Sequence, residues 1–341
     1  MNTEMGPKNK SEYAGYWIRR FLCEYLTDVR NMSANTVKAY RDAIRLLIQH
    51  VCNRKKATAD SLLIKDITSN EVISLLDELE LNRGCSIKTR NLRLSAFIAL
   101  AKYVSSNCPE FIEWCINIKN IPVKKAQRTL ITYLEKNEMD ALLEIPDRNT
   151  VQGWRDYVLL LFLYNTGARA EEAASLQIKD LTMPKGRGLP FVTITGKGNK
   201  KRRCPLWDET RKELRILIAK RDPEEYVFIN RLKQPMSRFG VYEMVTRHAN
   251  KLTEKMPSLK SKRVSPHTIR HTTATHLLQA GVDINTIRAW LGHVSIETTN
   301  IYAEVNLEMK AKALLNCEIK TKKSRKRWRD DKNLMDFLDS L

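Results

Sequence analysis

The stretch SPHTIRHTTATHLL, residues 265–278, opens a helix in the second half of this 341-residue chain. Ser265 is a good N-cap, and Pro266 suits the first turn of a helix. His267 and Arg270 are then three residues apart, on one face of the first turns. A guanidinium fork and an imidazole on one face can grip a phosphate together. The stretch therefore predicts an anion site at the start of a helix.

The histidines of the chain gather in this region. Four of the six are His267, His271, His276 and His293. A zinc site is the obvious alternative, but no Cys and no close Asp or Glu accompanies them. We therefore expect no metal, and we interpret His271 and His276 as structural, with His271 supporting the site.

A second motif, TGARAEEAASL (166–176), follows the longest apolar run, residues 158–164. Gly167 suits the position just after a helix end, so Arg169 is expected at a fixed junction before another helix. Glu172, three residues later, is placed to orient the Arg169 guanidinium. Taken alone, the motif equally describes a salt bridge at a helix start.

Two further motifs complete the second half. The alternating stretch FVTIT (191–195) precedes a Gly-Lys-Gly-Asn turn, which predicts a β-hairpin with Lys197 in its turn. In AWLGHVSIETTNIYAEV (289–305), Gly292 ends one helix, and a helix capped by Ser295 carries Tyr302. A lone tyrosine at helical spacing is usually a core residue. Deprotonating a phenol at pH 7 costs roughly 4 kcal/mol in water, which nearby arginines would partly offset.

The first third of the chain reads as helices over 12–29, from a cap at Ser33 to residue 51, and over 70–80 and 86–105. In the last of these, Leu92 is expected inside, and a basic outer face holds Lys88, Arg90 and Arg93. Residues 117–128 form an irregular basic linker that contains Lys124, Lys125 and Arg128. These six side chains are candidate DNA contacts, although a charged helix face is often only solvated.

The net charge of +20 attracts polyanions, since solubility alone needs a net charge of only roughly 2–8 for a small domain. The seven cysteines are odd in number and include no C-x-x-C pair, which favours a reducing cytoplasm. No stretch approaches the roughly 18 continuous apolar residues of a membrane helix.

The chain resembles the tyrosine recombinase, or phage-type integrase, family. The resemblance covers roughly residues 13–315, is strong in the second half, and rests there on TGARAEEAASL, TGKGNKKRRCPL, SPHTIRHTTATHLL and AWLGHVSIETTNIYAEV. An ordered set of six residues matches the family pattern: Arg169, Lys197, His267, Arg270, His293 and Tyr302.

The resemblance implies a mainly α fold with a small β-sheet. It implies an α-helical core-binding domain over 1–116, a linker over 117–128, a mixed α/β catalytic domain over 129–315 and a basic tail with a short helix over 316–341. The activity it implies is site-specific recombination of double-stranded DNA without a cofactor. Members assemble as tetramers, pass through a Holliday junction and in some cases need accessory recombinases.

The resemblance also implies a role for each matched residue. Arg169 and Arg270 would clamp the scissile phosphate, and His293 would hydrogen-bond it. Lys197 would protonate the 5′-oxygen, and His267 would assist proton transfer. Tyr302 would attack, giving a 3′-phosphotyrosine intermediate.

The basic tail beyond Tyr302 favours an integrase or transposase of a mobile element. The alternatives are a Xer-like resolvase of chromosome or plasmid dimers, a DNA-binding protein without catalysis and, more distantly, a type IB topoisomerase. In the tail, an apolar stripe predicts a short helix that docks on a neighbouring subunit, unless the tail is a disordered basic segment. The stripe consists of Leu334, Phe337, Leu338 and Leu341.

Overall fold

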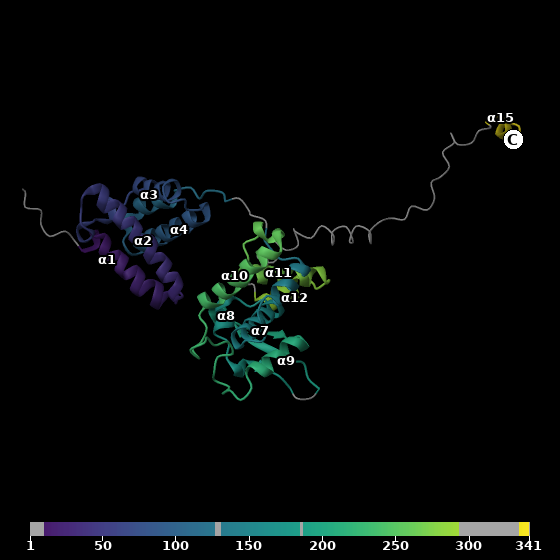
Figure 1. Ribbon diagram of the computed structural model, residues 1–341. Helices are drawn as coiled ribbons and strands as arrows, with labels where there is room; N and C mark the ends of the chain where they lie inside the picture. The colour runs from purple at the N-terminus through teal and green to yellow at the C-terminus, as the bar shows by residue number, and fades with distance from the viewer. Residues whose placement is uncertain (1–9, 127–130, 185–186, 293–333, 341) are drawn as a thin grey trace, which may run out of the picture. The chain divides into compact units, whose positions relative to one another are not determined.

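The structure is a computed structural model that describes residues 10–126, 131–184, 187–292 and 334–340 (Figure 1). The chain divides into two compact units, Met1–Arg128 and Thr129–Leu341, and each unit has its own hydrophobic core. Within the described ranges, no helix has both the length and the apolar character needed to cross a membrane.

The N-terminal unit is helical, as the apolar spacing predicts. Its helices are α1 (Ala14–Arg20), η2 (Phe21–Val29), α2 (Ala34–Lys55), α3 (Ser69–Leu81), α4 (Ile87–Asn107) and α5 (Ile112–Lys119). A hydroxyl side chain caps the start of α2, α3 and α4, as Ser33 does by accepting the N–H of Thr36. The helices enclose a core that includes Trp17, Phe21 and Leu47. Short 3-10 turns lie at η1 (Lys10–Glu12), η3 (Ala59–Ser61), η4 (Ile64–Asp66) and η5 (Pro109–Phe111).

The first long helix differs from the continuous α-helix expected over 12–29. After Arg20 the backbone winds as a π-helix, and the N–H of Arg30 donates to the carbonyl of Tyr25, five residues back, at 2.9 Å. In this winding the ring of Tyr25 lies on that of Tyr103 in α4, with 4.8 Å between the ring centroids.

The buried face of α4 also differs from the expected one. Arg90, expected on the outer face, is 2% exposed, whereas Leu92, expected inside, is 59% exposed. Arg90 approaches Glu80 at 3.5 Å and donates to the carbonyl of Pro122 at 3.3 Å. The buried positions recur every three or four residues from Arg90 to Val104, so Arg90 belongs to the buried face of the helix. Its charge led to the opposite prediction.

The segment between the units begins later than expected. Helix α5 continues to Lys119, and Ile118 and Ile121 are buried, so the irregular backbone starts after Lys119 and not at residue 117. The following residues are tied to the N-terminal unit, because the backbone of Lys124 pairs with the side chain of Asn91.

The C-terminal unit surrounds α7 (Val151–Thr166), which is buried at every position from Asp156 to Thr166 and packs against neighbouring helices (Figure 1). The other helices are α6 (Lys136–Glu144), α8 (Ala170–Ala174), α9 (Asp208–Leu217), α10 (Arg238–Lys255), α11 (Pro266–Gln279) and α12 (Ile284–Leu291). Its 3-10 turns are η6 (Ile178–Asp180), η7 (Lys197–Asn199) and η8 (Pro257–Ser261).

A three-stranded antiparallel sheet in the order β1-β2-β3 completes this unit. Its strands are β1 (Leu181–Thr182), β2 (Phe191–Thr195) and β3 (Lys201–Pro205). The expected hairpin is β2 and β3, with Thr195 opposite Lys201 and η7 in the turn. The two-residue β1 was not expected, because so short a strand has no alternating pattern. The mainly α fold with a small sheet is thus confirmed.

A short helix, α15 (Leu334–Leu338), lies in the C-terminal tail. Met335 and Leu338 in it are exposed. Leu341, the last residue of the expected apolar stripe, lies outside the described residues.

Candidate active site

Arg169 stands at a junction whose geometry Gly167 fixes. Helix α7 ends at Gly167, which has φ +61°, and Arg169 is the N-cap of α8. Glu172 accepts the backbone N–H of Arg169 at 2.9 Å and its Nη1 at 2.7 Å, so the contact expected from the spacing is present. The Arg169 side chain is 40% exposed and the Glu172 side chain 5%. A buried carboxylate therefore holds an arginine that reaches solvent.

A second arginine, Arg202 of β3, contacts the same carboxylate. Its Nη1 and Nη2 donate to the two Glu172 oxygens at 3.1 and 2.7 Å, and its Nε donates to the carbonyl of Trp290 at 2.8 Å. Burial raises the pKa of Glu172, but the hydrogen bonds and charge of Arg202, together with Arg169, outweigh burial and lower this pKa to about 2. Glu172 is therefore ionised throughout the physiological range.

Arg270 lies in the first turns of α11, which begins as expected: Ser265 accepts the N–H of Thr268, and Pro266 follows the cap. The Arg270 side chain enters the protein and is 1% exposed. Its Nη1 donates to the carbonyl of Gly167 at 2.6 Å, and its Nη2 donates to that of Leu291 at 2.5 Å. Arg270 thus joins the ends of α7 and α12.

His267 is open to solvent on the first turn of α11. The protein atoms packed around it, and then the charges of Arg270 and Arg169, lower its pKa below the usual value. The lowered pKa favours the neutral form of the imidazole. A neutral imidazole can accept a proton.

His271 and His276 both lie below this surface. The His271 ring meets that of His267 edge to face, with centroids 4.3 Å apart, and burial followed by the charges of His267 and Arg270 lowers its pKa to about 4. Nδ1 of His276 is hydrogen-bonded to the Tyr164 hydroxyl at 2.7 Å, which agrees with a structural role. Across the described ranges, no group of three His, Cys, Asp or Glu side chains is placed to hold a metal ion.

The backbone of Lys197 lies in the turn between β2 and β3. The turn closes where the N–H of Gly196 donates to the carbonyl of Lys200 at 2.8 Å. A Cβ on Gly196 would lie 3.1 Å from Oε1 of Glu172, so the base of the turn packs directly on the carboxylate that holds Arg169.

His293 and Tyr302 lie outside the described residues. The chain reaches residue 293 from the end of α12, where Gly292 has φ +65°. The last two helical carbonyls there, of Trp290 and Leu291, accept from Arg202 and Arg270 respectively. The end of α12 is therefore anchored at the same cluster.

The candidate DNA contacts of the N-terminal unit differ in exposure. Lys88 and Lys125 are exposed, and Lys124 is exposed but paired with Glu80 at 2.8 Å. Arg93 is half-buried and donates to Sγ of Cys85, and Arg90 is buried, as described above. Arg128 is among the residues that the structure leaves undescribed.

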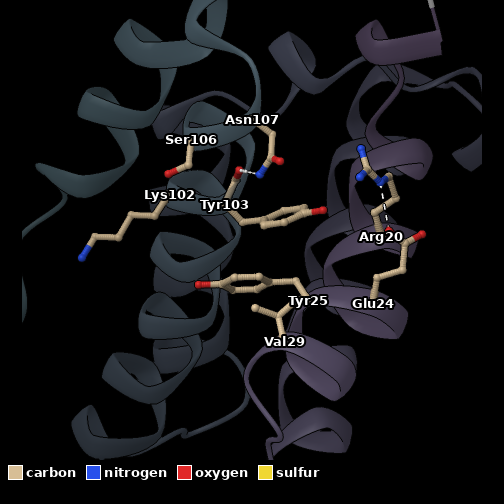
Figure 2. A pocket seen from close by; sticks show the side chains of 8 residues that line it. All are labelled: Arg20, Glu24, Tyr25, Val29, Lys102, Tyr103, Ser106 and Asn107. Atoms are coloured by element: carbon tan, nitrogen blue, oxygen red, sulfur yellow. Dashed lines mark hydrogen bonds and ion pairs between the residues drawn. The ribbon is translucent and has the colours of Figure 1, made fainter.

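The N-terminal unit also has a hollow of about 360 Å³ between α1, η2 and α4. Figure 2 shows the Tyr25 and Tyr103 rings facing each other in it, with Arg20 paired to Glu24 on one side and Lys102 extending from the other. This hollow could not be predicted from the sequence, because its aromatic residues come from helices far apart in the chain.

Arg202 is the residue of the site that the sequence analysis missed. A signal was present, since Arg202 and the buried Cys204 are two residues apart on a strand and thus face the same side. An arginine that shares a face with a buried cysteine should have been expected inside.

Comparison with known proteins identifies the family. The model described as "Phage integrase family" matches residues 132–309, and "Phage integrase, N-terminal SAM-like domain" matches residues 18–106. The chain therefore belongs to the phage integrase family, the tyrosine recombinases that cleave and rejoin DNA.

Two curated relatives and one solved structure illustrate the similarity. A putative integrase/recombinase of Sinorhizobium fredii, y4rC, is 37% identical over 326 residues, which cover 95% of this chain and 97% of the relative. The tyrosine recombinase XerD of Staphylococcus saprophyticus is 35% identical, over 83% of this chain and 93% of its own length. The XerH site-specific recombinase bound to a palindromic difH substrate superposes with a TM-score of 0.65 at 25% identity, over 84% of this chain and 80% of that one.

Proposed function

We propose that the chain recombines double-stranded DNA at specific sites, with Tyr302 as the nucleophile and a 3′-phosphotyrosine as the intermediate. The observation that carries this proposal is the meeting of Arg169, His267 and Arg270 at the ends of α7 and α12. They come from segments about a hundred residues apart in the chain, yet Arg270 donates to the carbonyl of Gly167, two residues before Arg169, and His267 lies one turn before Arg270 on α11. The chain then continues from this cluster toward residue 302.

The two arginines would stabilise the charge that develops on the phosphate oxygens. Arg169 is held from behind by Glu172 and reaches solvent, so its fork is oriented before DNA arrives. Arg270 is held by two backbone carbonyls, so its position does not depend on the substrate. Preorganisation of this kind lowers the barrier because the charges need not rearrange during the reaction.

The proton balance of the cleavage step can be assigned. The Tyr302 oxygen forms a bond to phosphorus, its proton passes to neutral His267, and the bond from phosphorus to the 5′-oxygen breaks. Lys197, on the hairpin turn, donates a proton to that oxygen. His293 would hydrogen-bond the phosphate. The phosphotyrosine retains the bond energy, so a 5′-hydroxyl can reverse the step on another strand without a nucleotide cofactor.

The N-terminal unit would contact the DNA backbone. Lys88, Lys124 and Lys125 are the exposed candidates, with Arg93 and Arg128 as further ones. We propose that four protomers synapse two duplexes and exchange strands through a Holliday junction, with accessory recombinases where the sites require them. The cysteines in the described residues are free thiols, which supports action in a reducing cytoplasm.

The biological setting has two candidates. An integrase or transposase of a mobile element is supported by the similarity to the putative integrase/recombinase y4rC, which covers 95% of this chain. A Xer-like resolvase is supported by the similarity to XerD. A recombination assay separates these two candidates. One plasmid substrate carries the ends of the element and the other carries chromosomal dimer-resolution sites, and each class of recombinase should act on only one of these substrates.

The cleavage chemistry is tested by trapping the covalent intermediate. The protein is incubated with a labelled duplex of its own site that carries a nick beside the scissile phosphate, so that a short fragment diffuses away after cleavage. A labelled protein–DNA band should survive a denaturing gel. Tyr302→Phe should bind the duplex with unchanged affinity and give no band, whereas Tyr242→Phe, a control at an exposed position of α10, should still give the band. A band with Tyr302→Phe would refute the assignment.

A further inference from the structure

Arg202 touches three parts of the site at once, although it carries no step of the proposed reaction. It contacts the Glu172 carboxylate, the Trp290 carbonyl at the end of α12 and, through its own strand, the hairpin turn that carries Lys197. Its side chain is 9% exposed, and its Nε, Nη1 and Nη2 each donate to a protein acceptor. Its five N–H groups form a rigid planar fork, which allows these contacts to be made together.

The contacts around Arg202 are close on every side. A Cβ on Gly292 would lie 3.1 Å from its Cδ, and a Cβ on Gly196 would lie 3.5 Å from its Nη1. Both positions are glycine in this chain, so the backbone before residue 293 and the backbone before Lys197 approach the guanidinium without hindrance. A shift of Arg202 would move both segments.

The remaining link is to Arg169. Arg202 and Arg169 donate to the same oxygen, Oε1 of Glu172, at 3.1 and 2.7 Å. The second oxygen, Oε2, accepts from Arg202 and from the backbone N–H of Arg169. The direction in which the exposed Arg169 fork points is therefore set by a carboxylate that Arg202 holds in place.

We propose that Arg202 is a positioning residue that aligns three elements for DNA cleavage: Arg169, the turn of Lys197 and the chain that leads into His293. This inference rests on the proposed function and deepens it. Arg202 does not touch the DNA in this account. Its removal should therefore lower the rate of cleavage and leave the affinity for DNA almost unchanged, because a small misplacement of catalytic groups slows the chemical step without removing phosphate contacts.

The chain offers a matched control on the same strand. Arg203 is exposed on the opposite face of β3, where it lies over the Phe191 ring and, within the part of the chain that the structure describes, bonds neither to Glu172 nor to the end of α12. Arg203→Met removes the same charge from the same strand. The test variants are Arg202→Met and Arg202→Lys; the lysine keeps a positive charge beside Glu172 and protects the fold, but it cannot form the fork to both carboxylate oxygens and the carbonyl.

The full-length proteins are compared in single turnover on the nicked duplex, with binding measured separately by titration. We expect Arg202→Met to slow adduct formation by about a hundredfold and Arg202→Lys by about tenfold, with Kd within about threefold of wild type. Arg203→Met should cleave at the wild-type rate. The inference is overturned if Arg202→Lys cleaves as fast as wild type, if rate and affinity fall in equal proportion, or if Arg203→Met loses as much rate as the Arg202 variants.

A pH profile separates positioning from a loss of folded protein. Glu172 is faced by Arg169 at the start of α8 and by Arg202 and Cys204 of β3. Without Arg202, only Arg169 opposes the effect of burial, so the pKa of Glu172 rises relative to its value in the wild type. As the pH is lowered, the cleavage rate of Arg202→Met should then fall more steeply than that of wild type, and Glu172→Gln in the same chain should remove that added dependence. A profile parallel to wild type would overturn the mechanism. If the wild-type protein itself forms no adduct, the proposed function fails first.

Discussion

Gly167 offers a quantitative test of how the site is held together, through the substitution Gly167→Ala. Gly167 ends α7 with φ +61°, and a Cβ there would lie only 2.5 Å from Cδ2 of Leu291. The carbonyls of these two residues are the acceptors for Nη1 and Nη2 of Arg270. A methyl group at Gly167 therefore collides with the side chain of Leu291, which belongs to one of the two segments that Arg270 joins.

The cost has two parts. An alanine in the left-handed conformation costs about 1–2 kcal/mol. The clash with Leu291 adds overpacking of about 1–3 kcal/mol, since Leu291 is fully buried and cannot move into solvent. Gly281 isolates the first part, because it has φ +85° with nothing within 4 Å of an added Cβ. Gly281→Ala should therefore cost about 1–2 kcal/mol, and Gly167→Ala about 2–5 kcal/mol.

The assay must report on the C-terminal unit alone, since the chain has two compact units. Hydrogen exchange of peptides from α7 in the full-length protein, followed against urea, gives the free energy of unfolding of that unit. Gly167→Ala should also slow cleavage more than Gly281→Ala does. Combining Gly167→Ala with Leu291→Ala should cost at least about 1 kcal/mol less than the sum of the two. Equal costs for the two glycine variants, or simple additivity with Leu291→Ala, would refute the reasoning.

Three further predictions follow from individual side chains. The pKa of His271 is about 4 in the folded protein and 6.5 for an ordinary histidine. As the pH falls, the unfolded chain therefore takes up this proton at a higher pH than the folded protein, and the free energy of unfolding decreases from about pH 6.5 downward. His271→Gln should reduce the loss between pH 7 and pH 5, measured by urea unfolding, by at most about 2 kcal/mol. Arg90→Met removes a buried hydrogen bond and an ion pair with Glu80, so it should destabilise the N-terminal unit by about 1–3 kcal/mol. The control Lys88→Met should change the free energy of unfolding of this unit, measured by hydrogen exchange, by less than about 0.5 kcal/mol. Arg169→Lys keeps the charge but loses the fork, so single-turnover cleavage should fall far more than DNA affinity; equal losses would reduce Arg169 to an ordinary phosphate contact.

The features that the sequence predicted are those with local causes. The caps at Ser33 and Ser265, the stop at Gly167 and the hairpin around residue 197 each depend on neighbours within a few positions, and all are present. The pairing of Arg169 with Glu172 belongs to the same class, since it spans three residues.

The features that were missed depend on partners far along the chain. The burial of Arg90 requires the carbonyl of Pro122, and the place of Arg202 requires Glu172 and Trp290, 30 and 88 residues away. A charged side chain is normally expected outside, because burial costs free energy unless a partner compensates it. Such partners become visible only when the fold brings distant segments together.

The central claim is that Tyr302 carries the DNA strand, and identification of the DNA-linked peptide tests it most directly. The wild-type adduct on the nicked duplex is formed in the presence of a metal chelator, digested with protease and nuclease, and sequenced by mass spectrometry. The account predicts a single modified peptide, with the nucleotide joined through its 3′-phosphate to the Tyr302 oxygen, and a free 5′-hydroxyl on the released strand. A nucleotide on any other residue, a 5′-phosphate linkage, or loss of the adduct under chelation would contradict it.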